Sequence, residues 1–250
     1  MWKRDTPEAK SSSPCEPAGP PLGHGASGQD DANPDANADG LGIEMTDHQR
    51  AWVDAHLNVP RKAEAFSARM VVLVEGISDE LALEALARRH GRSLDHEGVA
   101  IVPMGGSKNI GRFLDLFGPR GLDVGLAGLC DAAEEGDFRR GLERAGLGSN
   151  LARADLEGLG FYVCVEDLED ELIRSLGAAA VERVIDAQGD LESFRTFQKQ
   201  PAWQGRTQEE QLRRFLGTRG GRKIRSASLL VDALDLTRVP RPLDRVLAHV

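Results

Sequence analysis

Short apolar runs alternate with helical patterns between residues 70 and 177, and this alternation restricts the chain to few folds. The first run, MVVLVE at 70–75, is continuous and rich in Val, which is typical of a strand buried in a parallel sheet. Three similar runs follow at 98–104, 123–130 and 160–165, and helical patterns occupy 78–91, 107–118, 137–146 and 166–177. We therefore expect an α/β fold, a Rossmann-like four-stranded parallel sheet with helices on both faces.

The remaining segments differ from this core in composition. Residues 178–250 carry only helical patterns, which predicts a C-terminal helical extension packed on the α/β domain of residues 68–177. Residues 1–41 are rich in Pro, Gly, Ser, Asp and Asn and almost lack large aliphatic side chains. Such a segment buries too little surface to offset its ordering entropy, so we expect a disordered tail. Residues 42–67 are predicted to form a helical lead-in.

Charge and cysteine content exclude several classes of protein. The net charge of −9 is wrong for a general nucleic-acid coat protein, so any DNA contact must be local, metal-assisted or helped by a partner. Three cysteines without a CxxC spacing argue against a disulfide framework and fit a reducing cytosol. Without a run of about 18 apolar residues or a signal peptide, we expect a cytoplasmic protein with no membrane partner.

Carboxylates follow three of the four predicted strands. Glu75 ends the first strand, with Asp79 four residues later, and Asp131 ends the third. Further acidic residues follow at Glu134, Glu135, Glu166, Asp167, Glu169, Asp170 and Glu171. The carboxyl ends of parallel strands share one edge, where carboxylates repel unless cations lie between them. Because no His or Cys is placed for zinc, the sequence predicts Mg²⁺ or Mn²⁺.

Simpler interpretations exist for several of these residues. Asp79 and Glu169 can serve the helix dipole alone, and solvated surface is the favoured interpretation of Glu134 and Glu169. Glu75 is different, because an acid that ends an apolar run on a central strand is costly without a partner. Asp131 is intermediate between these cases. Cys130 and Cys164 lack a suitably spaced His, so we expect them to pack in the core.

Two further segments suggest anion contacts. Residues 105–108 (GGSK) begin a helix and can hold an anion on backbone N–H groups, or simply form a tight turn. They match no Walker A motif, and none occurs elsewhere, so the chain is not itself a P-loop ATPase. The basic stretch 219–225 either approaches phosphates or starts a solvated helix. A small phosphorylated ligand at residues 105–107 is a third, weaker hypothesis.

Four segments resemble the TOPRIM domain of OLD (overcoming lysogenisation defect) nucleases over about residues 68–235: VVLVEGISDELALEAL, VPMGGSKNIGRFLDLFG, GLAGLCDAAEE and CVEDLEDELIRSLG. The resemblance implies a TOPRIM-like fold and phosphodiester hydrolysis with two divalent metals, Mg²⁺ or Mn²⁺. It implies Glu75 and Lys223 as catalytic residues. It implies metal ligation by Glu75, Asp79, Asp131, Glu135 and Glu171, with Glu134 and Glu169 as the alternatives to the last two.

The chain departs from this pattern in two places. The Asp-x-Asp motif of the family reads Asp131-Ala132-Ala133, so its second carboxylate is missing. The tail of residues 1–41 stands where OLD proteins carry an ATPase domain, so we expect any ATPase to be a separate partner. The leading hypothesis is a metal-dependent DNA endonuclease or nuclease component. The alternative is a catalytically degenerate TOPRIM module that binds a separate ATPase or a nucleic-acid partner.

Overall fold

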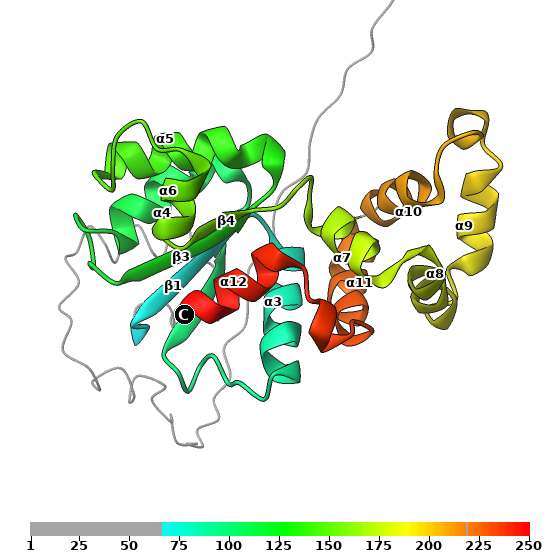
Figure 1. The fold of residues 1–250 in the computed structure, drawn as a ribbon, viewed down its shortest axis with the longest axis horizontal. Helices are drawn as coiled ribbons and strands as arrows, with labels where there is room; N and C mark the ends of the chain where they lie inside the picture. The colour runs from blue at the N-terminus through cyan, green and yellow to red at the C-terminus, as the bar shows by residue number, and fades with distance from the viewer. Residues whose placement is uncertain (1–66, 219) are drawn as a thin grey trace, which may run out of the picture. The chain divides into compact units, whose positions relative to one another are not determined.

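A computed structural model describes residues 67–218 and 220–250, so the expectations for the tail and for residues 42–66 lie outside the described residues. Its sheet consists of β1 (Met70–Val74), β2 (Val99–Pro103), β3 (Gly125–Cys130) and β4 (Phe161–Val163). The strands are all parallel and lie in the order β2-β1-β3-β4 (Figure 1). The predicted four-stranded parallel sheet is confirmed.

The strand order changes direction at β1. Val74, the last residue of β1, pairs with Pro103 of β2 on one side and with Leu129 of β3 on the other. The sheet is extended by β2 on one side of β1 and by β3 and β4 on the other side. Connections that diverge in this way leave a crevice at the carboxyl ends of β1 and β3. Ligands of open parallel sheets bind in such crevices, so a ligand site is expected at this edge.

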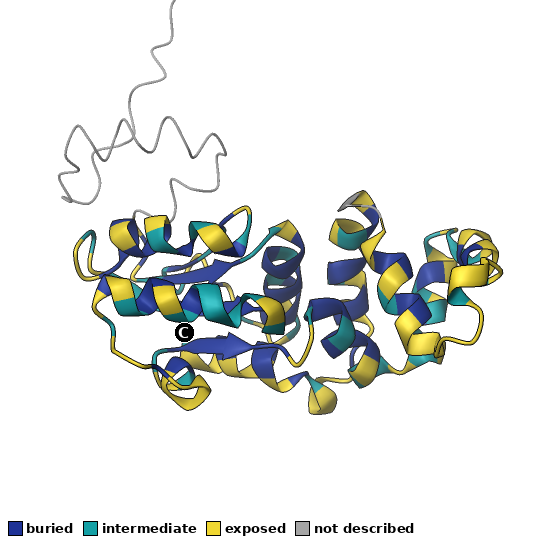
Figure 2. Cartoon of the chain, turned by 90° about the horizontal axis from the view of Figure 1, so that it is seen from above, coloured by how far each residue is buried: buried dark blue, intermediate teal, exposed yellow. Residues whose placement is uncertain are grey.

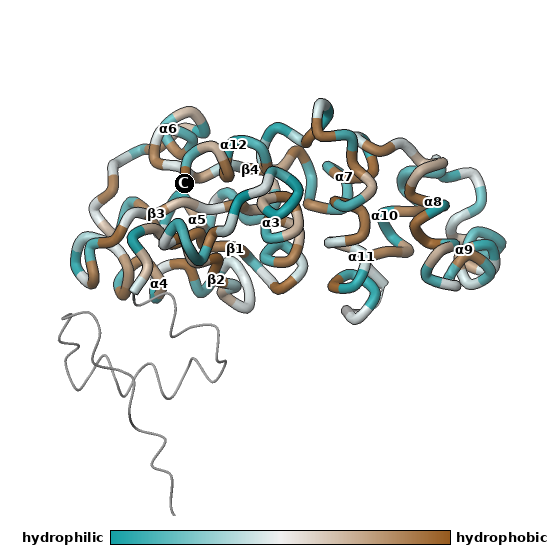
Figure 3. The backbone as a smooth tube through the Cα atoms, turned by 90° about the horizontal axis from the view of Figure 1, so that it is seen from below, coloured by the Kyte–Doolittle hydropathy of each residue, from teal (hydrophilic) through white to brown (hydrophobic). Residues whose placement is uncertain are grey.

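Side chains that alternate along β1 separate two hydrophobic cores. Val71 and Leu73 pack in one core, and Val72 and Val74 in the other, as the period of two of a strand requires. The first core is covered by α4 (Ile110–Phe117), α5 (Glu135–Ala145) and α6 (Arg153–Gly158) (Figure 1). The second is covered by α3 (Ile77–Arg89), α12 (Arg241–His249) and the rest of the helical extension. Figure 2 shows that the strands are largely buried, and Figure 3 shows that hydrophobic and hydrophilic residues alternate along the helices.

The helical extension packs onto the α/β core through α11. After α7 (Leu168–Leu176), the last helix of the α/β core, it comprises α8 (Ala178–Ala187), α9 (Leu191–Gln198), α10 (Gln208–Gly217), α11 (Gly220–Asp232) and α12. Helix α11 packs along α3, where Arg89 donates hydrogen bonds of 2.7 Å to the carbonyls of Val231 and Leu234. At the start of α10, Thr207 Oγ1 accepts from Glu210 N (3.2 Å) and Glu210 Oε2 accepts from Thr207 N (2.9 Å), which is a capping box.

The short helix α6 was not expected from the sequence. Helix α12 lies within the predicted helical extension and carries Pro242 in its first turn, where the missing N–H is harmless. Helix α12 packs on β3 and β4 and completes the cover of the sheet. Cys130 and Cys164 are buried as free thiols, as predicted. Among the helices that the structure describes, none combines the length and the hydropathy needed to cross a membrane.

Candidate metal centre

Glu75 and Asp131 reach the crevice from adjacent strands. Glu75 follows β1 directly and Asp131 follows β3 directly, so their positions are set by the β1–β3 register. After Asp131 the chain makes a 3-10 turn, η3 (Ala132–Glu134), that brings Glu134 back to the same place. One carboxylate oxygen from each of Glu75, Asp131 and Glu134 lies within 4.8 Å of the others. We call these three residues the carboxylate triad.

Asp79, in the first turn of α3, interacts electrostatically with members of the carboxylate triad. Its Oδ2 accepts a hydrogen bond of 2.9 Å from Gly76 N, so the side chain also caps the helix. The carboxylate is buried, and burial raises its pKa. Lys223 and the Gly76 N–H lower the pKa of Asp79, whereas the charge of Glu75 raises it again. The capping role and the electrostatic coupling to the site therefore coexist in one side chain.

Asp131 shows how strongly the carboxylates repel one another. Burial, and after it the charge of Asp79, raise the pKa of Asp131 from its ordinary 3.8 to about 8. Lys223 opposes this rise, and the more weakly acting Asp167 and Glu75 add to it. Glu134 responds in the same direction, because burial and then Glu75 raise its pKa. Because the charges of Asp79 and Glu75 act on Asp131, these three carboxylates lie in one region of the structure.

Lys223 and Glu169 form an ion pair beside this region. Lys223 is carried by α11 and Glu169 by the first turn of α7, with 3.2 Å between Nζ and Oε2. Burial alone would lower the pKa of Lys223, but Glu169, Asp79 and Asp131 together raise it, so the ammonium stays protonated. Glu169 is only 6% exposed, so the interpretation of this residue as solvated surface is wrong.

Glu135 and Glu171 have arginine partners instead. Glu135 pairs with Arg139 at 3.0 Å, one turn further along α5, and also with Arg153. The buried Glu171 accepts a hydrogen bond of 2.7 Å from Val165 N and pairs with Arg174 at 2.8 Å. The structure thus places Glu134 in the carboxylate triad and Glu169 beside it on Lys223, whereas Glu135 and Glu171 are held by arginines. We call the carboxylate triad together with Asp79 the carboxylate cluster.

Arg213 is a residue near the site that the sequence did not reveal. From α10 its Nε donates to Asp167 Oδ2 at 2.8 Å, and the guanidinium lies 3.5 Å from Glu166. The other oxygen of Asp167 accepts from Asp170 N at 2.8 Å and so caps α7, the helix that presents Glu169. Arg213 lies 46 positions from Asp167 in the chain, and no local pattern connects two residues so far apart.

The glycine loop after β2 supports Glu75 instead of offering its amides to an anion. The N–H groups of Gly105 and Gly106 both donate to the carbonyl of Glu75, at 3.0 and 3.1 Å. Their φ angles are +72° and +116°, which favours glycine at both positions. Ser107 Oγ donates to Asp137 at 3.1 Å. The tight-turn interpretation of residues 105–108 is therefore the better one.

The basic side chains in the first turns of α11 have different partners. Arg222 is buried, donates to the carbonyl of Phe215 and lies 3.9 Å from the centre of that ring. Arg225 pairs with Asp190 at 2.9 Å. Of the residues 220–225 that the structure describes, Lys223 is the one whose charge acts on the carboxylates.

Three helices begin at the carboxylate cluster. Asp79 lies in the first turn of α3 and Glu169 in the first turn of α7, and Lys223 is the fourth residue of α11. The amino ends of helices carry partial positive charge, which stabilises carboxylates and also attracts phosphate groups. The combination of three helix starts and one ammonium offsets part of the repulsion among the acids.

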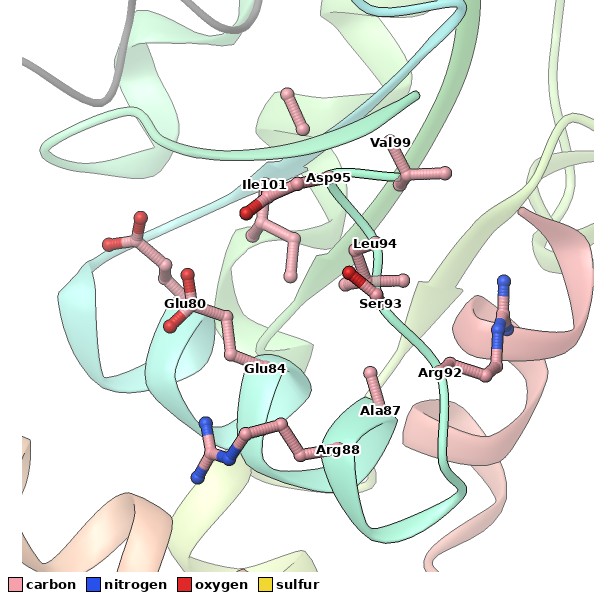
Figure 4. A pocket seen from close by; sticks show the side chains of 11 residues that line it. Glu80, Glu84, Ala87, Arg88, Arg92, Ser93, Leu94, Asp95, Val99 and Ile101 are labelled. Atoms are coloured by element: carbon pink, nitrogen blue, oxygen red, sulfur yellow. The ribbon is translucent and has the colours of Figure 1, made fainter. Parts of the chain in front are cut away.

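A cavity of about 430 Å³ between α3 and β2 is separate from the carboxylates (Figure 4). Its lining includes Glu80, Glu84 and Arg88 from α3 and Val99 and Ile101 from β2. Glu75, Asp79 and Asp131 are not part of this lining, so the cavity and the proposed metal centre are distinct.

Comparisons with known proteins agree with the fold described above. Residues 66–132 match the family model "Overcoming lysogenization defect protein-like, TOPRIM domain". The chain is also similar to the solved C-terminal region of the Burkholderia pseudomallei OLD protein, with 20% identity, a TM-score of 0.56 and coverage of 73% of this chain and 96% of that one. The corresponding region of the Xanthomonas campestris pv. campestris OLD protein is 23% identical, with a TM-score of 0.58 and coverage of 75% and 94%. No curated protein sequence matches the chain.

Proposed function

We propose that this chain, whose residues 66–132 carry an OLD-like TOPRIM domain, is a divalent-metal-dependent nuclease or nuclease component that hydrolyses phosphodiester bonds in DNA. The observation that carries the proposal is the carboxylate triad, whose oxygens lie within 4.8 Å of one another at the strand-order switch of the sheet. Carboxylates this close, with Asp79 beside them, are the natural surroundings of a bound cation.

The donor set fits a hard divalent cation. In the part of the chain that the structure describes, the triad offers carboxylate oxygens, which suit Mg²⁺ and Mn²⁺, and Cys130 and Cys164 are buried in the cores. The pKa of Asp131 is raised first by burial and then by the charge of Asp79, and a cation bound beside these carboxylates would offset both effects. We propose that Glu75, Asp79, Asp131 and Glu134 hold the metal, with Glu169 at the border of the site.

Glu134 takes the place of the missing second acid of the Asp-x-Asp motif. The side chain of Ala133 is exposed and offers no ligand, but the 3-10 turn places the next residue in the triad. Glu135 and Glu171, which the sequence suggested as ligands, would first have to exchange their arginine partners. They remain candidates for a second metal.

The chain's own groups supply the rest of the chemistry. When bound, divalent metals stabilise the attacking and leaving oxygens of an in-line displacement at phosphorus. Lys223 keeps its proton because of the surrounding carboxylates, and its ammonium would bind the phosphate as negative charge develops there. Glu169 holds that ammonium in position at 3.2 Å. The starts of α3, α7 and α11 add positive potential at the same edge.

The alternative function is a binding module without catalysis, docked on a nucleic acid or on a separate ATPase. Two observations favour it: Ala133 lacks a carboxylate, and the charge of Lys223 is already paired with Glu169. We expect a cytoplasmic location under either function.

Plasmid nicking with Mg²⁺ or Mn²⁺ separates the two functions. We expect the wild-type chain to nick and both Glu75→Ala and Asp131→Ala to lose at least about tenfold in rate, since each removes a ligand. Asp115→Asn is the control, because Asp115 is an exposed carboxylate on α4 that pairs with Arg120, away from the triad. Equal rates in all four proteins would contradict the proposal. Carboxylate-dependent Mn²⁺ binding without nicking would support the binding module.

A further inference from the structure

A groove lined by arginines lies at the carboxyl end of β4. It has a volume of about 550 Å³ and contains the side chains of Arg153, Arg174, Arg238 and Arg241, together with two glutamates. We call it the arginine groove. Val165, which is 59% exposed, contributes an apolar wall. In a chain of net charge −9, four arginines in one groove form a local basic surface.

Three arginines of this groove pair with carboxylates while their own side chains stay largely exposed. Arg153 pairs with Glu135, Arg174 with Asp170, and Arg241 with Glu157, and the arginine side chains are 50%, 46% and 60% exposed. Arg174 is held in addition by the buried Glu171. Exposed ion pairs contribute between about 0 and 1 kcal/mol, so a competing anion can replace the carboxylate partners of Arg153 and Arg241 at little cost. Arg238 is exposed as well.

The arginine groove adjoins the carboxylate cluster. The partner of Arg153 is Glu135, the residue next to Glu134 of the triad. On the other side, Arg174 pairs with Glu171, which lies two residues after Glu169. A strand of nucleic acid that crosses the carboxylates would therefore continue directly into the groove.

We propose that the arginine groove binds the phosphodiester backbone of DNA next to the bond that is cut, an inference that rests on the proposed function. Arginine matches phosphate with two parallel hydrogen bonds, and Val165 offers a surface for the sugars. An acidic peptide would meet the same arginines, but continuity with a phosphodiester-handling site favours DNA. The groove also answers how an acidic chain holds DNA, because the contact is confined to one basic surface.

The test uses substitutions with opposite expected effects. Arg238→Gln combined with Arg241→Gln removes two positive charges. Glu157→Gln removes the carboxylate that engages both Nη atoms of Arg241 and so releases that guanidinium. Arg120→Gln is the matched control, because Arg120 is 59% exposed and has one carboxylate partner at 2.7 Å, against 60% and 2.6 Å for Arg241. Arg120 follows α4, before β3, at the amino-terminal edge of the sheet.

Fluorescence anisotropy with a labelled DNA duplex in EDTA measures binding without cleavage. We expect the double variant to bind about tenfold more weakly, with a salt slope smaller by about 1 to 2, since each phosphate contact contributes about 0.9 to that slope. Glu157→Gln should bind more tightly and Arg120→Gln should match the wild type. Thermal unfolding of each variant checks that the fold is retained.

Several results would overturn the inference: a wild-type chain that binds no DNA, a double variant that binds like the wild type, or polyglutamate that competes as well as DNA does. The last would assign the groove to an acidic polypeptide. A chain that fails to nick DNA but binds it through these arginines would refute the proposed cleavage while supporting the groove.

Discussion

Lys223 on α11 and Glu169 on α7 form an ion pair of 3.2 Å that joins the helical extension to the carboxylate edge of the sheet. The pair links two helices that are remote in sequence, and Glu169 is almost fully buried. Because of it, the folding of the extension and the position of the ammonium at the site depend on each other.

Lys223→Met leaves Glu169 buried without its cation. We expect a loss of about 1–3 kcal/mol in the free energy of unfolding, because a buried charged acceptor without a partner is costly. Adding Glu169→Gln should restore much of this stability but none of the cleavage. Urea unfolding measures the first effect and plasmid nicking the second. A double variant that regains nicking would show that Lys223 has no role in catalysis.

The raised pKa of Asp131 predicts how the stability of the metal-free protein changes with pH. Its pKa is raised from 3.8 to about 8, chiefly by burial, so the folded state holds a proton that the unfolded chain releases. The stability contributed by this group is complete below about pH 4 and is lost as the pH rises towards 8. In EDTA, urea unfolding at pH 5 and pH 8 should show this loss, and Asp131→Asn should reduce it. Adding Mn²⁺ at pH 8 should restore stability. A wild-type protein as stable at pH 8 as at pH 5 would contradict the assignment.

Glu134 and Glu135 are neighbours with different expected roles. Glu134→Gln removes a member of the carboxylate triad and should weaken Mn²⁺ binding at least about tenfold. Glu135→Gln removes a partner of Arg139 and Arg153 and should leave Mn²⁺ affinity nearly unchanged. Calorimetric titration compares them directly. The reverse order of effects would make Glu135 the ligand, as the sequence first suggested.

Asp167 links Arg213 to the start of α7. Asp167→Ala removes the cap of that helix and should cost about 1 kcal/mol of stability. Asp167→Asn keeps the oxygen that accepts from Asp170 N but loses the charge that holds Arg213. We therefore expect the Asn variant to stay nearly as stable as the wild type, while its nicking rate falls. Equal nicking rates for Asn and wild type would show that Arg213 does not position the site.

The sequence was sufficient to predict the sheet and to place Glu75 and Asp131 at one edge of it. Val-rich runs identify strands whatever surrounds them, and Glu75 and Asp131 end two such runs, so the shared edge of a parallel sheet brings them together. Asp79 followed from its spacing of four residues from Glu75 and from the family resemblance.

The choice between neighbouring acids could not be made from the sequence. Whether Glu134 or Glu135 faces the triad depends on a single 3-10 turn, and a shift of one residue in that turn would exchange them. Likewise, Glu169 and Glu171 are separated by the local rotation of α7, which directs one to Lys223 and the other to Arg174. The contact of Arg213 depends on the packing of α10 against α7, which no local pattern encodes.

The most direct test of the central claim is an anomalous difference map from crystals grown with Mn²⁺. We predict a manganese peak coordinated by oxygens of Glu75, Asp131 and Glu134, the three residues whose carboxylates already lie within 4.8 Å of one another. We also predict that this peak disappears in crystals of Glu75→Ala. A map without a peak between these carboxylates, or with manganese bound only elsewhere on the chain, would contradict the assignment of a metal centre.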